Sequence, residues 1–536
     1  MSARRWSRSA MGEGVTCGYL TLPDSGAQLH YRRSGSGPPL IMLHPSPQSS
    51  EALEPAMAHF GKVCTCIALD TPGYGLSDDP TPDNASLADY AEVIFAAADA
   101  LGLDRFFLYG AATGAQIAIE MGKHRPKRLA LVLLDANGHI DAAERERVMR
   151  GYFPAVAPRR DGGHLLTLWD MCSGLFSAFP WNSDRPEDRL PIPRFPPEAI
   201  HAILLRYLDA GEDYAKAYRK AFEAEDIAHF TGFTASAVMT RWDGSAVLRI
   251  ADDLIAQGLP KNVRLLRAGP SLEERYAVQL EALSAAIGEE HFPAPDFEQR
   301  PPSGPHRAYL ETEVGQLHCR RSDAGKKEPI VMLHGAGSSC RQWLDYPESI
   351  SERWLIAIDL PGHGHSRIHP CSFDNLETLA APVIDAIREL PNNLHIIGEG
   401  LGGAVALRAA AASDLSLAVH LLPFTAMEQK GADSLRNGIP DVTPRASGAH
   451  LLEAWHFVRE RALRDPWNDG SVSAQRAEPL DQSPGMLHRQ TADILRVGAE
   501  FAAALKLEMA FDQDALIGKA DGPVHRIDSL ADALVQ

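Results

Sequence analysis

The chain of 536 residues repeats itself once, at a spacing near 288 residues. QLHYRRS from Gln28 matches QLHCRRS from Gln316, an interval of 288, and ALDTPGYGLS from Ala68 matches AIDLPGHGHS from Ala357, an interval of 289. Four further pairs of segments keep an interval between 286 and 290. A period of this length is too long for a solenoid repeat and suits a complete domain. The sequence therefore predicts two copies of one fold in tandem.

Each copy consists of short apolar runs that alternate with helical patterns. The runs are PLIMLH, CTCIALD, RFFLYG and LALVLLD in the first copy, and PIVMLH, WLIAID, LHIIG and LAVHLL in the second. Strands that alternate with helices are typical of a mostly parallel sheet covered by helices on both faces. The sequence therefore predicts an α/β fold for each copy.

The pattern also predicts where the domains begin and end. We expect an N-terminal tail over residues 1–18, a first domain over 19–290, a linker over 291–306 and a second, incomplete domain over 307–536. The linker segment is rich in proline and polar residues. Such a composition is typical of a connection between domains.

Charge and cysteine content narrow the class of protein. The chain has 52 basic and 70 acidic residues, a formal net charge of −18, and so repels nucleic-acid phosphates and acidic membrane surfaces. No apolar run approaches the roughly 20 residues that span a bilayer, and the N-terminal arginines lack the apolar stretch of an export signal. Cys64 and Cys66 share an apolar run and resemble core residues. We expect a cytoplasmic protein without a nucleic-acid or membrane partner.

Three motifs occur in the same order in both copies. They are an apolar strand ending in His44-Pro45-Ser46-Pro47 or His334-Gly335-Ala336-Gly337, an Asp-x-Pro-Gly-x-Gly-x-Ser motif at 70–77 and 359–366, and a glycine-flanked strand–turn–helix at 110–114 and 398–402. Together they resemble the α/β-hydrolase fold family, of the esterase and haloalkane-dehalogenase type, over most of both copies. The resemblance implies that insertions near 140–230 and 424–515 form helical caps over a cleft.

In that family the third motif is a nucleophile elbow, Gly-x-Ser-x-Gly. Its sharp turn lifts a nucleophile above the sheet, beside backbone N–H groups that bind an oxyanion. Here the elbows read Gly110-Ala111-Ala112-Thr113-Gly114 and Gly398-Glu399-Gly400-Leu401-Gly402. The tips, Ala112 and Gly400, cannot attack a carbonyl group. Thr113 and Glu399 lie beside the tips. Thr113 is a candidate nucleophile and Glu399 a candidate pocket acid. The alternative is that both side chains point away from the cleft.

The resemblance also implies an acid after the seventh strand and a histidine after the last strand. Asp243 holds the acid position in the first copy, and Asp528 resembles it in the second. The first copy has no histidine at the expected place, the next one being His291, and we expect the second copy to lack the last strand and its histidine. A hydrolase without its nucleophile and its base has no ordinary route to an acyl-enzyme.

Other side chains at the carboxyl ends of the strands are expected to converge on the same cleft. They are His44, Asp70, Asp135, His139 and Asp243 in the first copy, and His334, Asp359, His420 and Asp528 in the second. Asp135, His139 and Asp243 are candidates for an acid–base set that activates water directly. The resemblance implies instead that His44 packs under the oxyanion loop and that Asp70 braces its turn.

Aromatic residues and a histidine cluster complete the candidates. Trp169, Phe176, Phe179 and Trp181 in the first insertion, with Trp455 and Trp467 in the second, are pocket candidates, although aromatic residues at helical spacing more often form core. His363, His365 and His369 lie close together without the spacing of a metal motif. We therefore predict neither a metal ion nor a cofactor.

The motifs favour a protein that keeps the hydrolase fold and has lost the standard catalytic apparatus. It would bind a small molecule, or act as a scaffold, through the capped cleft of the first copy. The alternative is an atypical hydrolase or lyase that acts on a small ester, lactone or carbonyl substrate through the Asp/His set. A third interpretation is that Ala112 replaces a native serine. An open sheet edge in the second copy would allow a homo-oligomer.

Overall fold

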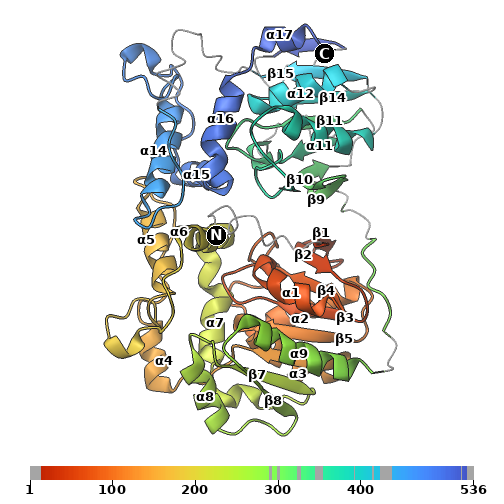
Figure 1. Ribbon diagram of the computed structural model, residues 1–536, viewed down its shortest axis with the longest axis vertical. Coiled ribbons are helices and arrows are strands. Elements are labelled where there is room, and N and C mark those ends of the chain that lie inside the picture. The colour runs from red at the N-terminus through yellow and green to blue at the C-terminus, as the bar shows by residue number, and fades with distance from the viewer. Residues whose placement is uncertain are drawn as a thin grey trace. The chain divides into compact units, whose positions relative to one another are not determined.

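The computed structural model describes residues 14–288, 292–298, 302, 304–322, 328–343, 354–390, 393–412, 416–422, 438–520 and 522–527. The chain divides into two compact units, Met1–Ala157 with Thr167–Arg300 and Pro158–Leu166 with Pro301–Gln536 (Figure 1). Each unit contains one sheet flanked by helices. This confirms the predicted tandem α/β fold.

The first sheet has eight strands in the order β1-β2-β4-β3-β5-β6-β7-β8. They are β1 (Thr16–Thr21), β2 (Gln28–Ser34), β3 (Pro39–Leu43), β4 (Thr65–Leu69), β5 (Phe106–Ala111), β6 (Leu129–Asp135), β7 (Ala237–Trp242) and β8 (Val263–Ala268). The β1–β2 and β2–β4 pairs are antiparallel, and all pairs from β4 to β8 are parallel. β3 and β5 are buried on both faces, which explains their unbroken apolar sequences. β1 begins three residues before the predicted start of the first domain.

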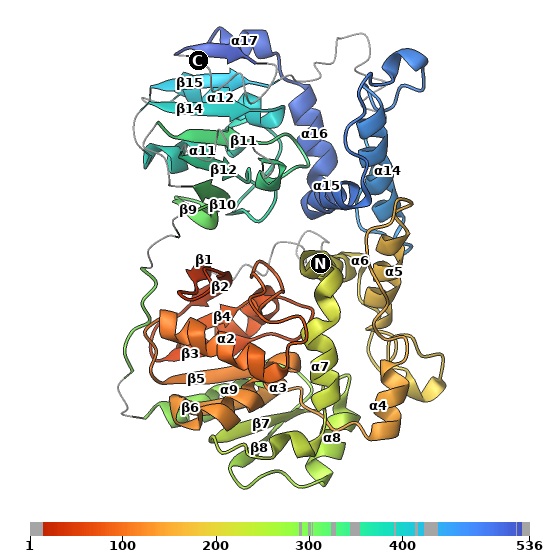
Figure 2. The ribbon, with the colours of Figure 1, turned by 180° about the vertical axis from the view of Figure 1, so that it is seen from behind.

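Helices cover both faces of this sheet. On one face α1 (Glu54–Phe60) contacts α9 (Leu272–Ile287), and on the other α2 (Leu87–Ala100) contacts α3 (Thr113–His124) (Figures 1 and 2). Under α1 and α9 lies a core that joins Phe107, Leu133 and Val238 of the sheet to Tyr276 and Leu283 of α9. The predicted core residues Cys64 and Cys66 are buried in the same cluster.

The first cap lies between β6 and β7. It consists of α4 (Ala142–Met149), α5 (Gly163–Gly174), α6 (Pro197–Ala210) and α7 (Lys216–Ala224), and α8 (Leu248–Ala256) follows β7. Figure 2 shows α7 running along one end of the strands of its sheet. Inside the cap, the ring of Tyr152 packs against Phe153, Phe179, Tyr218 and Phe222.

The second sheet repeats the first from β1 to β7. Its strands are β9 (His306–Thr312), β10 (Gly315–Ser322), β11 (Ile330–Leu333), β12 (Leu355–Ile358), β13 (Arg367–Ile368), β14 (Leu394–Gly398), β15 (Leu417–Leu421) and β16 (Val524–Arg526). The order is β13-β10-β12-β11-β14-β15-β16, with β9 paired to β10. β16 pairs parallel with β15, as β7 does with β6. No further strand follows β16 in the residues that the structure describes.

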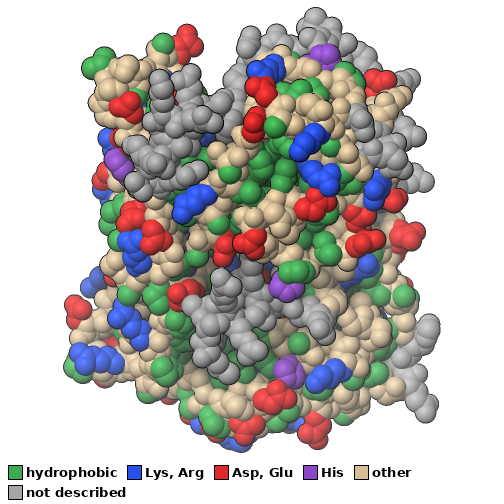
Figure 3. Space-filling model, turned by 45° about the horizontal axis from the view of Figure 1, so that its top comes forward, with side chains coloured by type: hydrophobic (Ala, Val, Ile, Leu, Met, Phe, Trp, Pro, Cys, Tyr) green, Lys and Arg blue, Asp and Glu red, His purple; other side chains and the backbone are tan. Residues whose placement is uncertain are grey.

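The second unit also has its own helices and cap. α11 (Glu377–Arg388) and α12 (Leu401–Ala412) flank the sheet, and α14 (Ala449–Leu463), α15 (Pro484–Val497), α16 (Phe501–Met509) and α17 (Gln513–Ile517) lie between β15 and β16. Among the described helices, none is both long and apolar enough to cross a membrane. On the face drawn in Figure 3, acidic and basic side chains are interspersed.

Candidate functional site

The elbow of the first unit lies between β5 and α3. Ala112 stands at its tip with φ 47° and ψ −110°, in a region that residues with side chains rarely adopt. A Cβ on Gly110 would overlap the backbone of Gly114, and a Cβ on Gly114 would overlap the carbonyl group of Leu43. The flanking glycines therefore let the turn close. The first unit keeps the backbone of a nucleophile elbow and carries a methyl group at its tip.

The elbow of the second unit lies between β14 and α12 and has the same form. Gly400 stands at its tip with φ 53°, and a Cβ on Gly402 would overlap the backbone of Leu333. Glu399, next to the tip, is half-buried and accepts a hydrogen bond from the side-chain amide of Gln342. Both elbows thus have the strand–turn–helix form that the sequence predicts.

His44 and His334 brace the loops beside the two elbows. The backbone N–H of Thr71 donates to Nε2 of His44 at 2.9 Å, so Nδ1 carries the proton and donates to the carbonyl group of Pro45 at 3.0 Å. Burial lowers the pKa of His44, in agreement with this neutral form. His334 makes the same two contacts in the second unit. Both imidazoles are occupied in holding their loops, as the family resemblance implies.

Two backbone N–H groups form the oxyanion hole of α/β hydrolases, one after the nucleophile and one in the loop after the third strand. In the first unit these groups belong to Thr113 and Ser46. The N–H of Ser46 donates to Oγ1 of Thr113 at 3.3 Å, and Thr113 is buried at the start of α3. The Thr113 hydroxyl therefore serves as an acceptor beside the hole and does not replace the missing nucleophile at the tip.

In the second unit the equivalent N–H groups belong to Ala336 and Leu401. Both donate to one carboxylate oxygen, Oε2 of Glu508 on α16, at 2.6 and 2.8 Å respectively. Glu508 is buried. The hole of the second unit is thus filled by an acid from its own cap, a contact that the sequence motifs did not predict.

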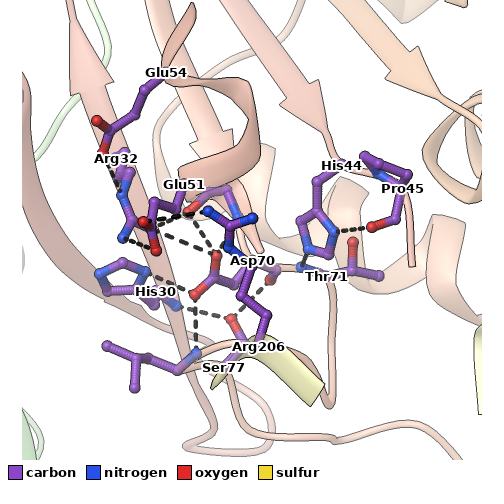
Figure 4. Close-up of polar contacts among 12 residues, drawn as sticks. His30, Arg32, His44, Pro45, Glu51, Glu54, Asp70, Thr71, Ser77 and Arg206 are labelled. Carbon is purple, nitrogen blue, oxygen red and sulfur yellow. Dashed lines mark hydrogen bonds and ion pairs between the residues drawn. The ribbon is translucent and has the colours of Figure 1, made fainter. Parts of the chain in front are cut away.

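Asp70, at the end of β4, organises a buried polar network (Figure 4). Its carboxylate accepts hydrogen bonds from Nδ1 of His30 at 2.8 Å, from the N–H of Leu76 at 2.9 Å, and from the N–H and hydroxyl of Ser50 at 2.6 and 2.5 Å. Burial alone would raise the pKa of Asp70, but His30 and Arg32 outweigh it and hold that pKa far below its usual range. An acid fixed in its ionised form braces the turn, as the family resemblance implies.

Asp359 repeats this network in the second unit. Its carboxylate accepts from Nδ1 of His318 at 2.8 Å, from the N–H of Cys340 at 2.5 Å and from the N–H of His365 at 2.9 Å. His318, Cys340 and Asp359 form the one group of three potential metal ligands found among the described residues. Burial raises the pKa of the Cys340 thiol, which keeps it in the protonated form that binds metals poorly. Ser50 contacts Asp70 in the same way in the first unit, so the network needs no ion.

The three histidines of the predicted cluster in the second unit each contact different residues. His363 contacts the rings of His334 and Phe373, and His365 contacts the ring of His318. His369 follows β13, where its backbone N–H donates to the carbonyl group of Val314. None of these three histidines belongs to the group of potential metal ligands described above.

The caps are fixed to their sheets at equivalent positions by side chains of opposite charge. In the first unit Arg206 on α6 lies 3.3 Å from Glu51 and donates to Oε1 of Gln48 at 2.8 Å (Figure 4). In the second unit Asp493 on α15 accepts a hydrogen bond from the hydroxyl of Ser339 at 3.0 Å. Burial raises the pKa of Asp493 to about 6. The contact of the second cap therefore depends on pH.

Asp135 belongs to a structural contact with α9. Its carboxylate accepts hydrogen bonds from the Tyr109 hydroxyl at 2.7 Å, from the Arg275 guanidinium at 2.6 and 2.9 Å, and from the Gln279 amide at 2.8 Å. Only 2% of its surface is exposed. Four donor contacts leave this carboxylate engaged in tying β6 to the last helix of the unit.

His139 and Asp243, the other members of the predicted acid–base set, lie apart from Asp135. Nδ1 of His139 is 3.7 Å from Oδ1 of Asp226, and Asp243 is half exposed and pairs with Arg241. No contact joins Asp135, His139 and Asp243 in the described part of the chain, so the set is not assembled there. Asp528 and His291 lie outside the described residues.

His420 was predicted to face the cleft, and the structure places it in a different contact. It lies within β15, where its Nε2 is 3.0 Å from Nδ1 of His395 on β14. Its ring also stacks on His525 of β16 at 5.2 Å between centroids. His420 lies opposite His525 in the register, and its partner on β14, Ile397, is two residues from His395. Since residues two apart on a strand share a face, the three imidazoles lie on one face of the sheet.

The aromatic pocket candidates have different surroundings. Phe176 stacks on Phe195 with ring centroids 4.0 Å apart and lines a cavity of about 320 Å³ in the first cap. Phe179 and Trp181 instead pack in the core of that cap. The remaining candidates pack within helices or against neighbouring rings: Trp169 and Trp455 are buried, and Trp467 contacts Phe457.

Two buried acids were missed by the motifs. Glu508 fills the second hole, and Glu225 follows α7 and accepts a hydrogen bond from the N–H of Gly138 at 2.7 Å. Burial raises the pKa of Glu225 to about 8. Neither acid belongs to a known motif; the available signal for Glu508 was a lone acid on the apolar side of FAAALKLEM.

Two family models match the chain. The alpha/beta hydrolase fold matches residues 38–243, and the alpha/beta hydrolase family matches residues 330–533. Over 227 residues the chain is 31% identical to the pimeloyl-[acyl-carrier protein] methyl ester esterase of Methylococcus capsulatus, which covers 39% of this chain and 83% of that protein. The chain belongs to the α/β hydrolase family and contains two copies of its fold in tandem.

Other similarities are shorter or concern the fold alone. Protein phosphatase methylesterase 1 of Mus musculus is 29% identical over 136 residues, 24% of this chain and 35% of that protein, so the chain spans about a third of that relative's length. Among solved structures, a bacterial membrane phospholipase A has 17% identity and a TM-score of 0.41 over 54% of this chain and 90% of that one. E-2-(acetamidomethylene)succinate hydrolase has 20% identity and a TM-score of 0.36 over 51% and 99%.

Proposed function

We propose that this protein is a tandem α/β hydrolase that binds a small molecule at the elbow of its first unit without hydrolysing it. The observation that carries the proposal is Ala112, where the strained backbone of the elbow persists around a methyl group. His44 cannot act as the base because both of its ring nitrogens are engaged. A site with neither nucleophile nor base supports binding better than acyl transfer.

The ligand class that suits this elbow is a small ester, lactone or carboxylic acid. The N–H groups of Ser46 and Thr113 occupy the positions of an oxyanion hole. Such a pair of donors recognises a carbonyl or carboxylate oxygen whether or not a nucleophile is present. Relatives named as methyl ester esterases support an ester or its acid as ligand.

The test measures binding and turnover together on the full-length protein. Short carboxylic acids and their methyl esters are titrated by calorimetry, and release of acid from the esters is followed in parallel. We expect saturable binding without turnover above buffer. Ala112→Leu should abolish the binding by filling the elbow, whereas the matched change Gly400→Ala in the second unit should leave it unchanged.

Turnover would replace this proposal with its alternative. Ester or lactone hydrolysis that disappears in His139→Ala or Asp243→Asn would identify an atypical hydrolase or lyase that uses those side chains as acid and base. Binding that survives Ala112→Leu would show that the ligand lies elsewhere and would overturn the proposed site.

A further inference from the structure

The oxyanion hole of the second unit is filled from within. Oε2 of Glu508 receives both N–H groups of the hole, from Ala336 and Leu401. A single oxygen held by two backbone donors is the contact that such a hole offers to an oxyanion. The charge on the acceptor makes these hydrogen bonds stronger than bonds between neutral groups. Glu508 therefore occupies the hole as a ligand would.

The tip of the second elbow has the one residue that leaves room for this carboxylate. A Cβ on Gly400 would lie 2.5 Å from Oε2 of Glu508, well inside the usual separation of non-bonded atoms. The first unit has Ala112 at the same place. The glycine at the second tip thus has a physical consequence beyond the loss of a nucleophile, because it admits the acid of the cap.

The first cap has no acid at the position equivalent to Glu508. α6 and α15 each end at a glycine with φ 65°, Gly211 and Gly498 respectively. Glu508 is the tenth residue after Gly498, and the tenth residue after Gly211 is Ala221, which is buried on α7. The two units therefore differ at both positions together, with Ala112 and Ala221 in one and Gly400 and Glu508 in the other.

The surroundings of Glu508 contain charges of both signs. Burial raises the pKa of its carboxyl group, and the N–H groups of the hole together with Arg461 oppose that rise. Glu399, beside the tip, adds a negative charge that favours the protonated form. A buried acid in this setting depends on the donors of the hole to offset its desolvation.

We propose that the oxyanion hole of the second unit is a working site for small carboxylates and that Glu508 is its built-in ligand. The second unit is then closed to outside ligands by its own cap. When the Glu508 side chain is removed, a free carboxylate of acetate size takes its place. This inference concerns the second unit and does not rest on ligand binding by the first.

The test uses the full-length Glu508→Ala variant, with acetate as the probe and chloride as the control for ionic strength. Amide hydrogen exchange is measured in the segments that contain Ala336 and Leu401. Without acetate we expect exchange there to be roughly tenfold faster than in the wild type, because two hydrogen bonds to a charged group are lost. Acetate should restore protection in the variant, chloride should not, and the wild type should respond to neither.

Glu508→Gln is the matched control. Its amide oxygen can accept the same two hydrogen bonds, so the hole stays filled and acetate should have no effect. Wild-type exchange in Glu508→Ala without acetate, or no recovery with acetate, would overturn the proposal. So would an acetate effect confined to the first elbow, which would leave the proposed function intact.

Unfolding of Glu508→Ala would not end the test. In that case the variant is refolded in acetate and in chloride at equal ionic strength, and the yield of soluble protein is compared. A higher yield in acetate supports a carboxylate site, and equal yields overturn it.

Discussion

The two elbows of this chain have the same backbone form and differ in what occupies the oxyanion hole. At the first, Ala112 stands at the tip and the N–H of Ser46 donates to the Thr113 hydroxyl at 3.3 Å. At the second, Gly400 leaves space and Glu508 from the cap takes both donors. The comparison teaches that losing a nucleophile leaves the donors of the hole in place. Buried donors need an acceptor, and each unit supplies a different one.

A second contrast lies on the sheet face under α9. In the first unit this face is apolar, with Phe107, Leu133 and Val238 packed beneath the helix. The strand registers put three histidines at the corresponding positions of the second unit, His395, His420 and His525. The described part of the second unit has no helix equivalent to α9. Polar imidazole rings that contact one another therefore replace apolar side chains that needed a cover.

The largest expected effect tests whether the buried carboxylate that follows the fourth strand, Asp70 or Asp359, is equally essential to both units. Asp70→Asn should destabilise the first unit by roughly 3–5 kcal/mol, because His30 and the N–H groups of Ser50 and Leu76 lose their buried, charged acceptor. Asp359→Asn is the matched change in the second unit. Urea unfolding followed by hydrogen exchange with mass spectrometry reports the stability of each unit separately. If one substitution destabilised both units, each carboxylate would not stabilise its own unit alone, and the prediction would be contradicted.

The stabilisation that Asp70 contributes depends on pH. The pKa of Asp70 is depressed in the folded state, so its contribution to stability is present above the unfolded pKa of about 4 and is lost as pH falls below it. Asp70→Asn should therefore remove part of the acid sensitivity of the first unit, and an unchanged acid transition would argue against this role.

Asp135→Asn should lower the stability of the first unit, because Asp135 has a structural and not a catalytic role. The substitution leaves Arg275 without its carboxylate partner, and we expect the first unit to lose about 3 kcal/mol of stability. The second unit serves as the internal control, since its described part contains no equivalent of α9. Guanidinium unfolding with peptide-resolved exchange measures both. A folded, fully stable variant that has lost an enzymatic activity would restore Asp135 as a catalytic candidate.

The stabilisation that Asp493 contributes to the second unit should decrease as pH rises. Its pKa is raised to about 6 in the folded state, so the stabilisation is present below the unfolded pKa of about 4 and is lost as pH climbs to about 6. Asp493→Asn should remove this dependence and stabilise the second unit at pH 7 by about 1–2 kcal/mol. Amide hydrogen exchange in α15 between pH 5 and 7 is the measurement, with the equivalent helix α6 of the first unit as the control.

The smallest expected effect comes from putting a nucleophile back. Ala112→Ser should raise ester hydrolysis by less than about tenfold, because both ring nitrogens of His44, beside the elbow, are already engaged. Ester cleavage by the purified variant, with Gly400→Ser as its counterpart, gives the answer. Fast hydrolysis by Ala112→Ser would show that a working base is present and that the serine alone was missing.

Much of the fold could be predicted from the sequence because its signals are local. The buried strands appear as unbroken apolar runs, the elbows appear as glycines around Ala112 and Gly400, and the repeat aligns one unit with the other. The same local signals predicted the bracing roles of His44 and Asp70 through the family resemblance. They did not reveal the contacts of Asp135 and His139, since the end of a strand does not say which helix will meet the side chain.

The sequence by itself determined that the chain folds twice in the same way and that both elbows lack a nucleophile, because these properties depend on periodicity and on residues within a few positions of one another. Only the tertiary structure decided that Arg275 takes Asp135 and that Glu508 fills the second hole. The partners in these contacts lie 140 and 172 or 107 residues apart. Such contacts form when packing brings distant segments together, and no local pattern records which buried donor a distant acid will reach.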